Sequence, residues 1–101
     1  MPTNNMRAVH PGEVLREEFL VPLGMSANAL SLALRVPAPR INDVVRERRA
    51  ISPDTALRLA RFFDTTAQFW LNLQMSYDLK RAELEAGQQI ADEVRPMQRV
   101  A

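Results

Sequence analysis

Residues 25–49 decide the fold of this chain, and they read MSANALSLALRVPAPRINDVVRERR. Ser26 is suited to cap a helix, because its hydroxyl accepts from the free backbone N–H groups of a first turn. Apolar residues then recur at helical spacing as far as Leu34. Pro37 and Pro39 end that helix and begin another, since the fixed φ and missing N–H of proline suit only a first turn. The stretch therefore predicts two short helices joined by a tight turn.

The second of these helices is predicted to bury one side and expose the other. Ile41, Val44 and Val45 recur at helical spacing, so they should face inward. The residues left on or near the outward side are Arg40, Asn42, Asp43 and Arg46. A short helix, a tight turn and a second helix with a polar outward face form a helix-turn-helix pattern. Many helical domains contain such a corner, so the pattern indicates DNA binding without establishing it.

The composition describes an ordinary globular domain. The chain has 101 residues, of which 47% are hydrophobic and 25% charged, which fits one domain with a real core. Cysteine is absent, which excludes a disulfide framework and a thiolate metal site. The first ten residues contain no apolar run that resembles a secretion signal, and no stretch has the length of a membrane span. We therefore expect a cytoplasmic protein.

Positive charge is concentrated in the middle of the chain. The formal net charge is only +1. Residues 35–61 nevertheless hold seven arginines against three acidic residues, whereas residues 1–34 and 62–101 are each net negative. A localised basic face is what phosphate binding needs, whatever the total charge. The alternative interpretation is a solvated surface with scattered arginines.

Before the central stretch, the sequence predicts an arm and one helix. Residues 1–9 have no hydrophobic period and are expected to form a flexible N-terminal arm. Residues 10–13, HPGE, begin a helix with Pro11 in its first turn, and Pro22 and Gly24 end it.

After the central stretch, the sequence predicts two further helices. Residues 52–54, SPD, are typical of a helix start, and Leu57 is among the apolar residues assigned to the buried side of that helix. Thr65 is expected to cap the last helix, with Gln68 in the capping-box position. We expect that last helix to end near Glu85.

The pattern along the whole chain is helical. No run of residues alternates as a half-buried strand does, so we predict an all-α fold. Residues 10–85 should form one helix-turn-helix domain, and residues 86–101 a C-terminal tail.

The last helix has apolar residues on more than one face. Trp70, Leu73 and Tyr77 form one line, and a second line lies beside it. Either the other helices surround this helix completely, or the second line is a homodimer contact, which is the interpretation we prefer. The predicted dimer residues are Phe69, Leu71, Met75 and Leu79.

The start of the second helix of the pair contains the candidate base-reading residues. Arg40 is able to form a bidentate pair with guanine, or to bind a phosphate. Ala38 and Pro39 offer only apolar contact, for instance to a thymine methyl group. Asn42 and Asp43 lie one turn further on. Asp43 either accepts from cytosine N4 or pairs with Arg40 three residues earlier.

Other residues near the pair are candidates for backbone contacts. Arg46, Arg48 and Arg49 are better placed for phosphates than for bases. Ser26 and Asn28, at the start of the first helix of the pair, are able to add phosphate hydrogen bonds.

Four segments of the sequence together resemble the HigA family of antitoxins. They are HPGEVLREEFLVPLGMSANALSLAL, VPAPRI, RRAISPDTALRLARFF and TAQFWLNLQMSYDL, which cover His10 to about Glu85. The resemblance implies a five-helix Xre/Cro-like (lambda-repressor-like) domain that forms a homodimer and binds double-stranded operator DNA of its own operon. It also implies a partner, a HigB-type toxin, which is a ribosome-dependent mRNA-cleaving nuclease that the antitoxin neutralises. By this resemblance, the family's base-reading residues fall on Ala38, Pro39, Arg40, Asn42 and Asp43, and its backbone-contacting residues on Arg46, Arg48 and Arg49.

The chain departs from the family pattern at three positions. Arg35 stands where the family usually has glycine in the turn, and Glu47 stands where it has glycine after the recognition helix. Glycine's freedom at positive φ is lost at both places, so we expect altered geometry or strain. Pro39 replaces a small polar residue and removes one possible DNA contact.

Two other classes of function are alternatives to this interpretation. One is a protein-interaction module, or a stand-alone Xre-type regulator without a cognate toxin, motivated by Asp43, Glu47 and Pro39. The other is an enzyme, which we do not expect because the sequence offers no nucleophile–base pair, no phosphate-binding glycine loop and no metal cluster. His10 is the only histidine, and we assign it to a helix start. No cofactor is expected.

Overall fold

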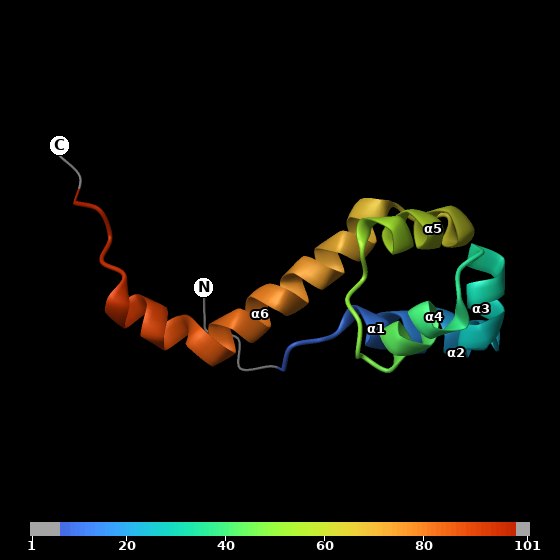
Figure 1. The fold of residues 1–101 in the computed structure, drawn as a ribbon, viewed down its shortest axis with the longest axis horizontal. Coiled ribbons are helices and arrows are strands. Elements are labelled where there is room, and N and C mark those ends of the chain that lie inside the picture. The colour runs from blue at the N-terminus through green and yellow to red at the C-terminus, as the bar shows by residue number, and fades with distance from the viewer. Residues whose placement is uncertain (1–6, 99–101) are drawn as a thin grey trace.

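The computed structural model describes residues 7–98, and these residues fold into five helices (Figure 1). The first is continuous and consists of α1 (Pro11–Val14), a π-helical segment η1 (Leu15–Leu20) and α2 (Val21–Leu23). It is followed by α3 (Ala27–Leu34), α4 (Ala38–Val45), α5 (Pro53–Phe63) and α6 (Ala67–Glu93). The all-α prediction is confirmed. Parts of the predicted arm and tail, residues 1–6 and 99–101, lie outside the described residues.

Three helix starts lie where the sequence predicts them. His10 caps α1, and its Nδ1 accepts from the backbone N–H of Gly12 at 2.8 Å. Ser26 caps α3, and its hydroxyl accepts from the N–H of Ala29 at 3.0 Å. Ser52 caps α5 in the same way. Each cap satisfies one of the backbone donors that a helix start leaves free.

The cap of α6 is one residue later than predicted. Thr66, not Thr65, accepts from the N–H of Phe69 at 3.0 Å. The hydroxyl of Thr65 accepts instead from the indole N–H of Trp70 at 2.9 Å. Because Trp70 is fully buried, its N–H needs a partner inside the protein, and Thr65, five residues earlier, supplies it while Thr66 caps the helix. Gln68 donates to Asn72 rather than completing a capping box.

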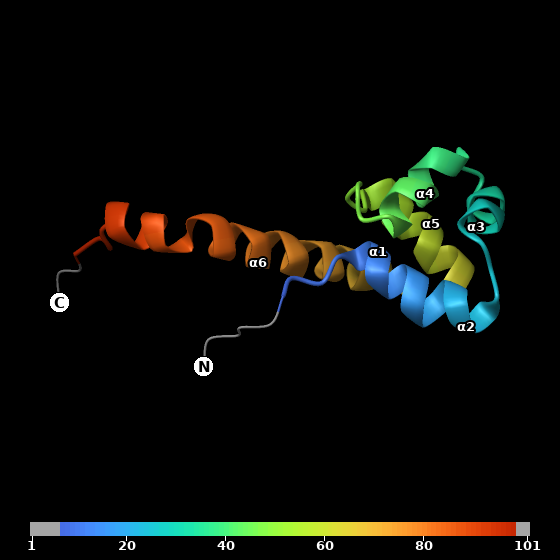
Figure 2. The same cartoon turned by 90° about the horizontal axis from the view of Figure 1, so that it is seen from below.

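All five helices contribute to one hydrophobic core. The largest fully buried apolar side chains are Leu15, Leu30, Ile41, Val44, Leu59 and Trp70. Leu57, which the sequence pattern assigned to the buried side of α5, is instead 62% exposed. In Figure 2 the body contains α1 to α5 and the start of α6, and the rest of α6 projects away from it.

The last helix is longer than the sequence suggested. It continues past Glu85 to Glu93 and leaves the body of the molecule well before its end (Figure 1). Only its first part faces the core, where Trp70 and Gln74 are buried. None of the helices in residues 7–98 is long and apolar enough to cross a membrane.

Two close contacts fix α4 against the first helix. A Cβ atom built on Gly12 would lie 1.8 Å from the backbone oxygen of Val44, so only glycine permits this approach of α1 to α4. Arg16 donates to the carbonyl of Val45, the last residue of α4, and to Glu47 at 3.3 Å. A cation at this end of a helix also interacts favourably with the helix dipole.

Candidate nucleic-acid interface

The turn between α3 and α4 keeps its geometry although it has no glycine. Arg35 ends α3 with φ of 62°, and Glu47 follows α4 with φ of 63°, so both residues adopt the left-handed conformation. The N–H of Val36 bonds to the carbonyl of Ser31, as in helix ends where glycine supplies this conformation. The left-handed conformation is therefore kept at both positions without glycine. Because this conformation is unfavourable for a residue with a Cβ atom, the structure favours strain over altered geometry, the other expected outcome.

Arg40 is held by a carboxylate of α5. Its guanidinium donates to Asp54 at 2.5 Å, and its side chain is 30% exposed. Arg58 donates to the same oxygen of Asp54 at 2.8 Å and to the carbonyl of Leu34 at 2.8 Å. The hydrogen bonds from Arg58 and Arg40 hold the pKa of the Asp54 carboxyl below its usual value. This cluster joins the end of α3 to the starts of α4 and α5.

The suggested pairing of Asp43 with Arg40 does not occur. Asp43 accepts from Arg49 at 3.4 Å, whereas Arg40 points to Asp54. The reason is tertiary: α5 brings its N-terminal carboxylate closer to Arg40 than the residue three positions along α4. In this structure Arg40 therefore occupies an ion pair within the protein rather than the open side of α4.

Two amides connect the outward sides of α3 and α4. Asn42 donates to the side-chain oxygen of Asn28 at 2.8 Å and to the backbone oxygen of Ala38 at 2.9 Å. Asn28 is exposed at the start of α3, two residues after the cap residue Ser26, which is also exposed. Pro39 is exposed in the first turn of α4, and Ala38 is half-buried. The candidate residues of the two helices thus lie along one polar side.

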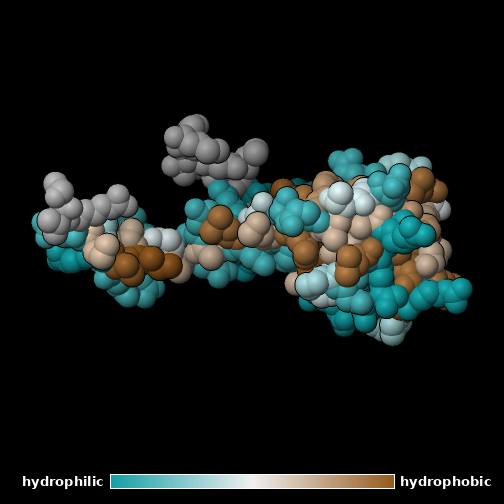
Figure 3. Space-filling view, turned by 90° about the horizontal axis from the view of Figure 1, so that it is seen from above, coloured by the Kyte–Doolittle hydropathy of each residue, from teal (hydrophilic) through white to brown (hydrophobic). Residues whose placement is uncertain are grey.

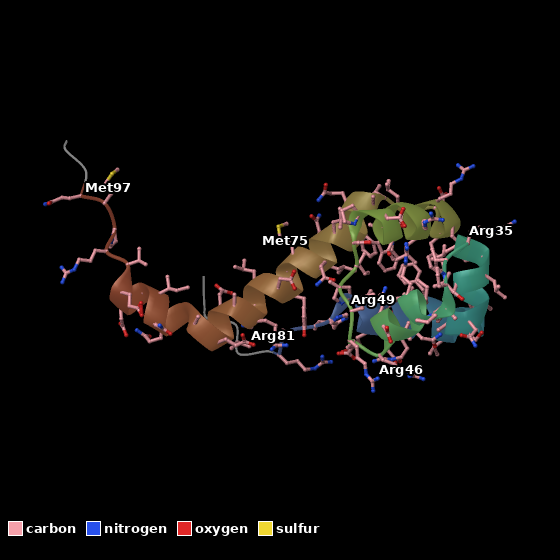
Figure 4. The ribbon with its side chains drawn as sticks, in the orientation of Figure 1. Arg35, Arg46, Arg49, Met75, Arg81 and Met97 are labelled. Atoms are coloured by element: carbon pink, nitrogen blue, oxygen red, sulfur yellow. The ribbon has the colours of Figure 1, made fainter. Side chains whose placement is uncertain are left out.

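The segment after α4 supplies the cations. Arg46, Arg48 and Arg49 are all exposed, and within residues 7–98 Arg46 and Arg48 have no ion pair. Figure 4 shows Arg46 extending from the body at the end of α4, and Arg35 at the end of α3, in the turn that leads to α4. Arg46 and Arg48 are thus placed to meet phosphates, the contact that a basic flank of a recognition helix makes.

Four residues that position the pair were missed by the sequence analysis. Arg16 and Arg58 bond the last carbonyls of α4 and α3, and Asp54 holds Arg40. Gln74 is buried on α6 and accepts from the N–H of Ile51 at 2.7 Å, which fixes the loop between α4 and α5. Gln74 lies on the same line of α6 as Trp70 and Tyr77, and a polar residue on an apolar line indicates a buried hydrogen bond. Nothing in the local sequence indicates the role of Arg16.

An apolar stripe remains uncovered on α6. Met75 is 60% exposed and Leu79 is 59% exposed, while Phe69 is exposed less and Leu71 packs partly against the core. Figure 3 shows hydrophobic side chains recurring along the helix that projects from the body. The alternative in which the chain's own helices surround α6 completely is therefore wrong for Met75 and Leu79.

Known proteins are similar to this chain in both fold and sequence. A model of the helix-turn-helix family matches residues 15–70. Virulence-associated protein I of Dichelobacter nodosus is 61% identical over 79% of this chain and 74% of its own length. Antitoxin HigA-1 of Vibrio cholerae is 36% identical over 72% of this chain and 69% of its own. The solved structure of Pseudomonas aeruginosa antitoxin HigA with the higBA promoter has 53% identity and a TM-score of 0.89, covering 91% of this chain and all of that one.

The fold and the exposed basic segment that follows α4 define a helix-turn-helix DNA-binding domain of the Xre type. The residues matched by the family model contain α3 and α4, together with all but the start of the first helix. The chain belongs to the HigA family of antitoxins. This family consists of DNA-binding regulators and is not an enzyme class.

Proposed function

We propose that this protein is an antitoxin and transcriptional autorepressor that binds the operator of its own operon as a dimer and neutralises a HigB-type toxin in the cytoplasm. The observation that carries the DNA-binding part is the exposed side of α3 and α4, bounded by the unpaired guanidinium groups of Arg46 and Arg48. The Pseudomonas aeruginosa relative, whose structure includes the higBA promoter, supports DNA binding by this chain.

In this proposal α4 enters the major groove and its neighbours hold the phosphates. Ala38, Pro39, Asn42 and Asp43 are proposed to face base edges. Pro39 and Asp43 lie on the side of α4 away from the buried Ile41, and the half-buried Ala38 and Asn42 lie between. Backbone contacts come from Ser26, Asn28, Arg46, Arg48 and Arg49. Arg40 contributes a guanine or phosphate contact only after it leaves Asp54, so we rank it below the others.

DNA binding is tested with the duplex that lies directly upstream of this reading frame. Titrations across a salt series should give a slope of log affinity against log salt of about −0.9 for each phosphate contacted. Arg46→Ala should weaken binding to all sequences alike. It should also reduce the magnitude of that slope by about 0.9, the contribution of one phosphate contact. Arg95→Ala is the matched control, because Arg95 is equally exposed but lies beyond the end of α6. Absence of binding at low salt would refute the proposal.

The dimer is proposed on the apolar stripe of α6. Two-fold dimers let helix-turn-helix proteins span two half-sites, and uncovered apolar residues on a projecting helix suit such a contact. Met75→Glu should therefore produce monomers in sedimentation velocity measurements. Leu84→Glu is the matched control, because Leu84 is 63% exposed but lies about half a helical turn away in angle from Met75. If both variants remain dimers, another surface forms the contact.

Toxin neutralisation is proposed from family membership. The test is co-purification of this protein with the product of the adjoining reading frame, and rescue of cell growth when both are expressed. A second candidate function is a protein-interaction module or stand-alone regulator without a toxin. It is favoured by one observation, the ion pair that occupies Arg40. Operator binding without any toxin partner would select the stand-alone regulator.

A further inference from the structure

The side-chain amide of Asn42 has both of its hydrogens engaged within the protein. A carboxamide nitrogen carries two N–H groups, and its carbonyl oxygen accepts. One N–H of Asn42 donates to Oδ1 of Asn28 at 2.8 Å, and the other donates to the backbone oxygen of Ala38 at 2.9 Å. Within residues 7–98 no group donates to the Oδ1 atom of Asn42. What Asn42 still offers to a ligand is an acceptor alone.

Asn28 is the residue that fixes this orientation from outside α4. The bond to Ala38 joins residues four positions apart in one helix, whereas the bond to Asn28 comes from the preceding helix. Asn28 is exposed, so its amide is not held in place by burial. Together the two acceptors determine which end of the Asn42 amide faces outward.

This orientation changes what Asn42 reads in a major groove. A free asparagine pairs with adenine through both ends of its amide, donating to N7 and accepting from N6. An acceptor alone requires a base that presents a donor, and the major groove offers two, the N6 amino group of adenine and the N4 amino group of cytosine. Guanine and thymine present the acceptors O6, N7 and O4 at their edges, which repel a carbonyl oxygen.

We propose that Asn28 is a positioning residue for base recognition, which makes Asn42 an acceptor-only reader of amino-bearing bases and rejects keto bases. This inference rests on the proposed DNA binding. Asn28 itself contacts no base in this scheme. It acts by occupying a donor of Asn42 that would otherwise be free to reach guanine or thymine.

The test measures base preference rather than affinity alone. Each base pair of the upstream duplex is changed in turn, and each duplex is titrated with the wild-type protein and with its variants. At one position in each half-site the wild type should prefer adenine or cytosine over guanine or thymine by about tenfold, the scale of a single mismatch. Asn28→Ala should reduce this preference to about threefold or less, without altering preferences at other positions.

Two rescue variants separate positioning from a structural role. Asn28→Asp keeps an oxygen that accepts from Asn42, so it should retain the base preference while its charge weakens binding to all sequences. Asn42→Asp is acceptor-only through its own chemistry, so the double variant Asn28→Ala, Asn42→Asp should regain the preference that Asn28→Ala loses. Asn28→Ala also removes the proposed phosphate contact, so a loss of affinity equal for all sequences is expected in either case, and only a change in base preference marks Asn28 as a positioning residue.

The outcomes distinguish this inference from the function on which it rests. If the wild type fails to bind the duplex at low salt, the proposed DNA-binding function is wrong and the inference falls with it. If the wild type binds with the expected preference and Asn28→Ala retains that preference, only the role assigned to Asn28 is wrong. Circular dichroism melting of Asn28→Ala should match the wild type, because the residue is exposed and alanine favours a helix.

Discussion

Gly12 is the position where the docking of α4 depends most directly on one atom. A methyl group there would lie 1.8 Å from the oxygen and 2.8 Å from the carbonyl carbon of Val44, whereas real Cβ contacts stay beyond 3.0 Å. Both atoms belong to the backbone of α4, so no side-chain rotation relieves the clash. The same Cβ atom would also lie 3.0 Å from Nδ1 of His10, which caps this turn. We therefore expect Gly12→Ala to displace α4.

The size of the effect follows from the kind of clash. Overpacking a well-packed core usually costs about 1–3 kcal/mol, and a contact with rigid backbone belongs at the upper end of this range. For a domain near 100 residues, about 3 kcal/mol corresponds to a fall in melting temperature of about 12–24 °C. Operator affinity should fall as well at a temperature where the variant is still folded, because the displaced helix is the one proposed to enter the groove.

Gly87→Ala provides the matched control for this substitution. Gly87 lies inside α6, and a Cβ atom there meets nothing closer than Glu83 at 3.9 Å. Replacing a mid-helix glycine should stabilise the protein by about 0.5–1 kcal/mol. Both variants are melted by circular dichroism at one protomer concentration, since association shifts the midpoint. A Gly12→Ala melting midpoint close to that of the wild type would contradict this prediction. It would show that α1 and α4 separate enough to admit a methyl group with no loss of stability.

Three further predictions concern single residues. Arg35→Gly should raise stability to urea by about 0.5–1 kcal/mol, because the strain of a left-handed arginine exceeds the entropy that glycine adds; an unchanged urea midpoint would mean that Arg35 carries no strain. Gln74→Met should cost about 1–3 kcal/mol by leaving the buried N–H of Ile51 unpaired, and a loss below 0.5 kcal/mol would contradict this. Burial lowers the pKa of His10 below 6.5, so the unfolded chain takes up its proton first and the free energy of unfolding should fall as the pH drops below about 6.5. His10→Asn keeps a cap acceptor and should lose this dependence between about pH 6.5 and 5, above the range in which carboxyl groups titrate.

Much of the fold is readable from the sequence because its helix starts are local. His10, Ser26 and Ser52 each cap the helix that follows them through a bond no more than three residues long. Either Thr65 or Thr66 is suited to a cap, and the capping-box spacing favoured Thr65, but the hydroxyl of Thr65 is taken by the buried indole N–H of Trp70. The rule therefore located the helix but missed its first residue.

Neither the last residue of α6 nor the ion-pair partner of Arg40 could be predicted from the sequence, and the two have different reasons. The helix was expected to end before Gly87, but a single glycine costs only about 1 kcal/mol, and the surrounding glutamine, alanine and glutamate residues favour a helix. Pro96 is the first residue beyond Glu85 that a helix interior does not tolerate. Arg40 pairs with Asp54, fourteen residues away, and only the folded chain brings the two together. Base-reading roles for Arg40 and its neighbours stay predictions.

In the proposed dimer, the register in which two copies of α6 pair sets how far apart the two copies of α4 sit on an operator. If two such helices pair in opposite directions along the stripe that contains Met75 and Leu79, each residue of slippage moves one domain by about 1.5 Å relative to the other. A shift of one heptad then amounts to about 10 Å, or about three base pairs of duplex. The centre-to-centre distance between half-sites is therefore a direct measurement of the pairing register, obtainable from footprinting alone.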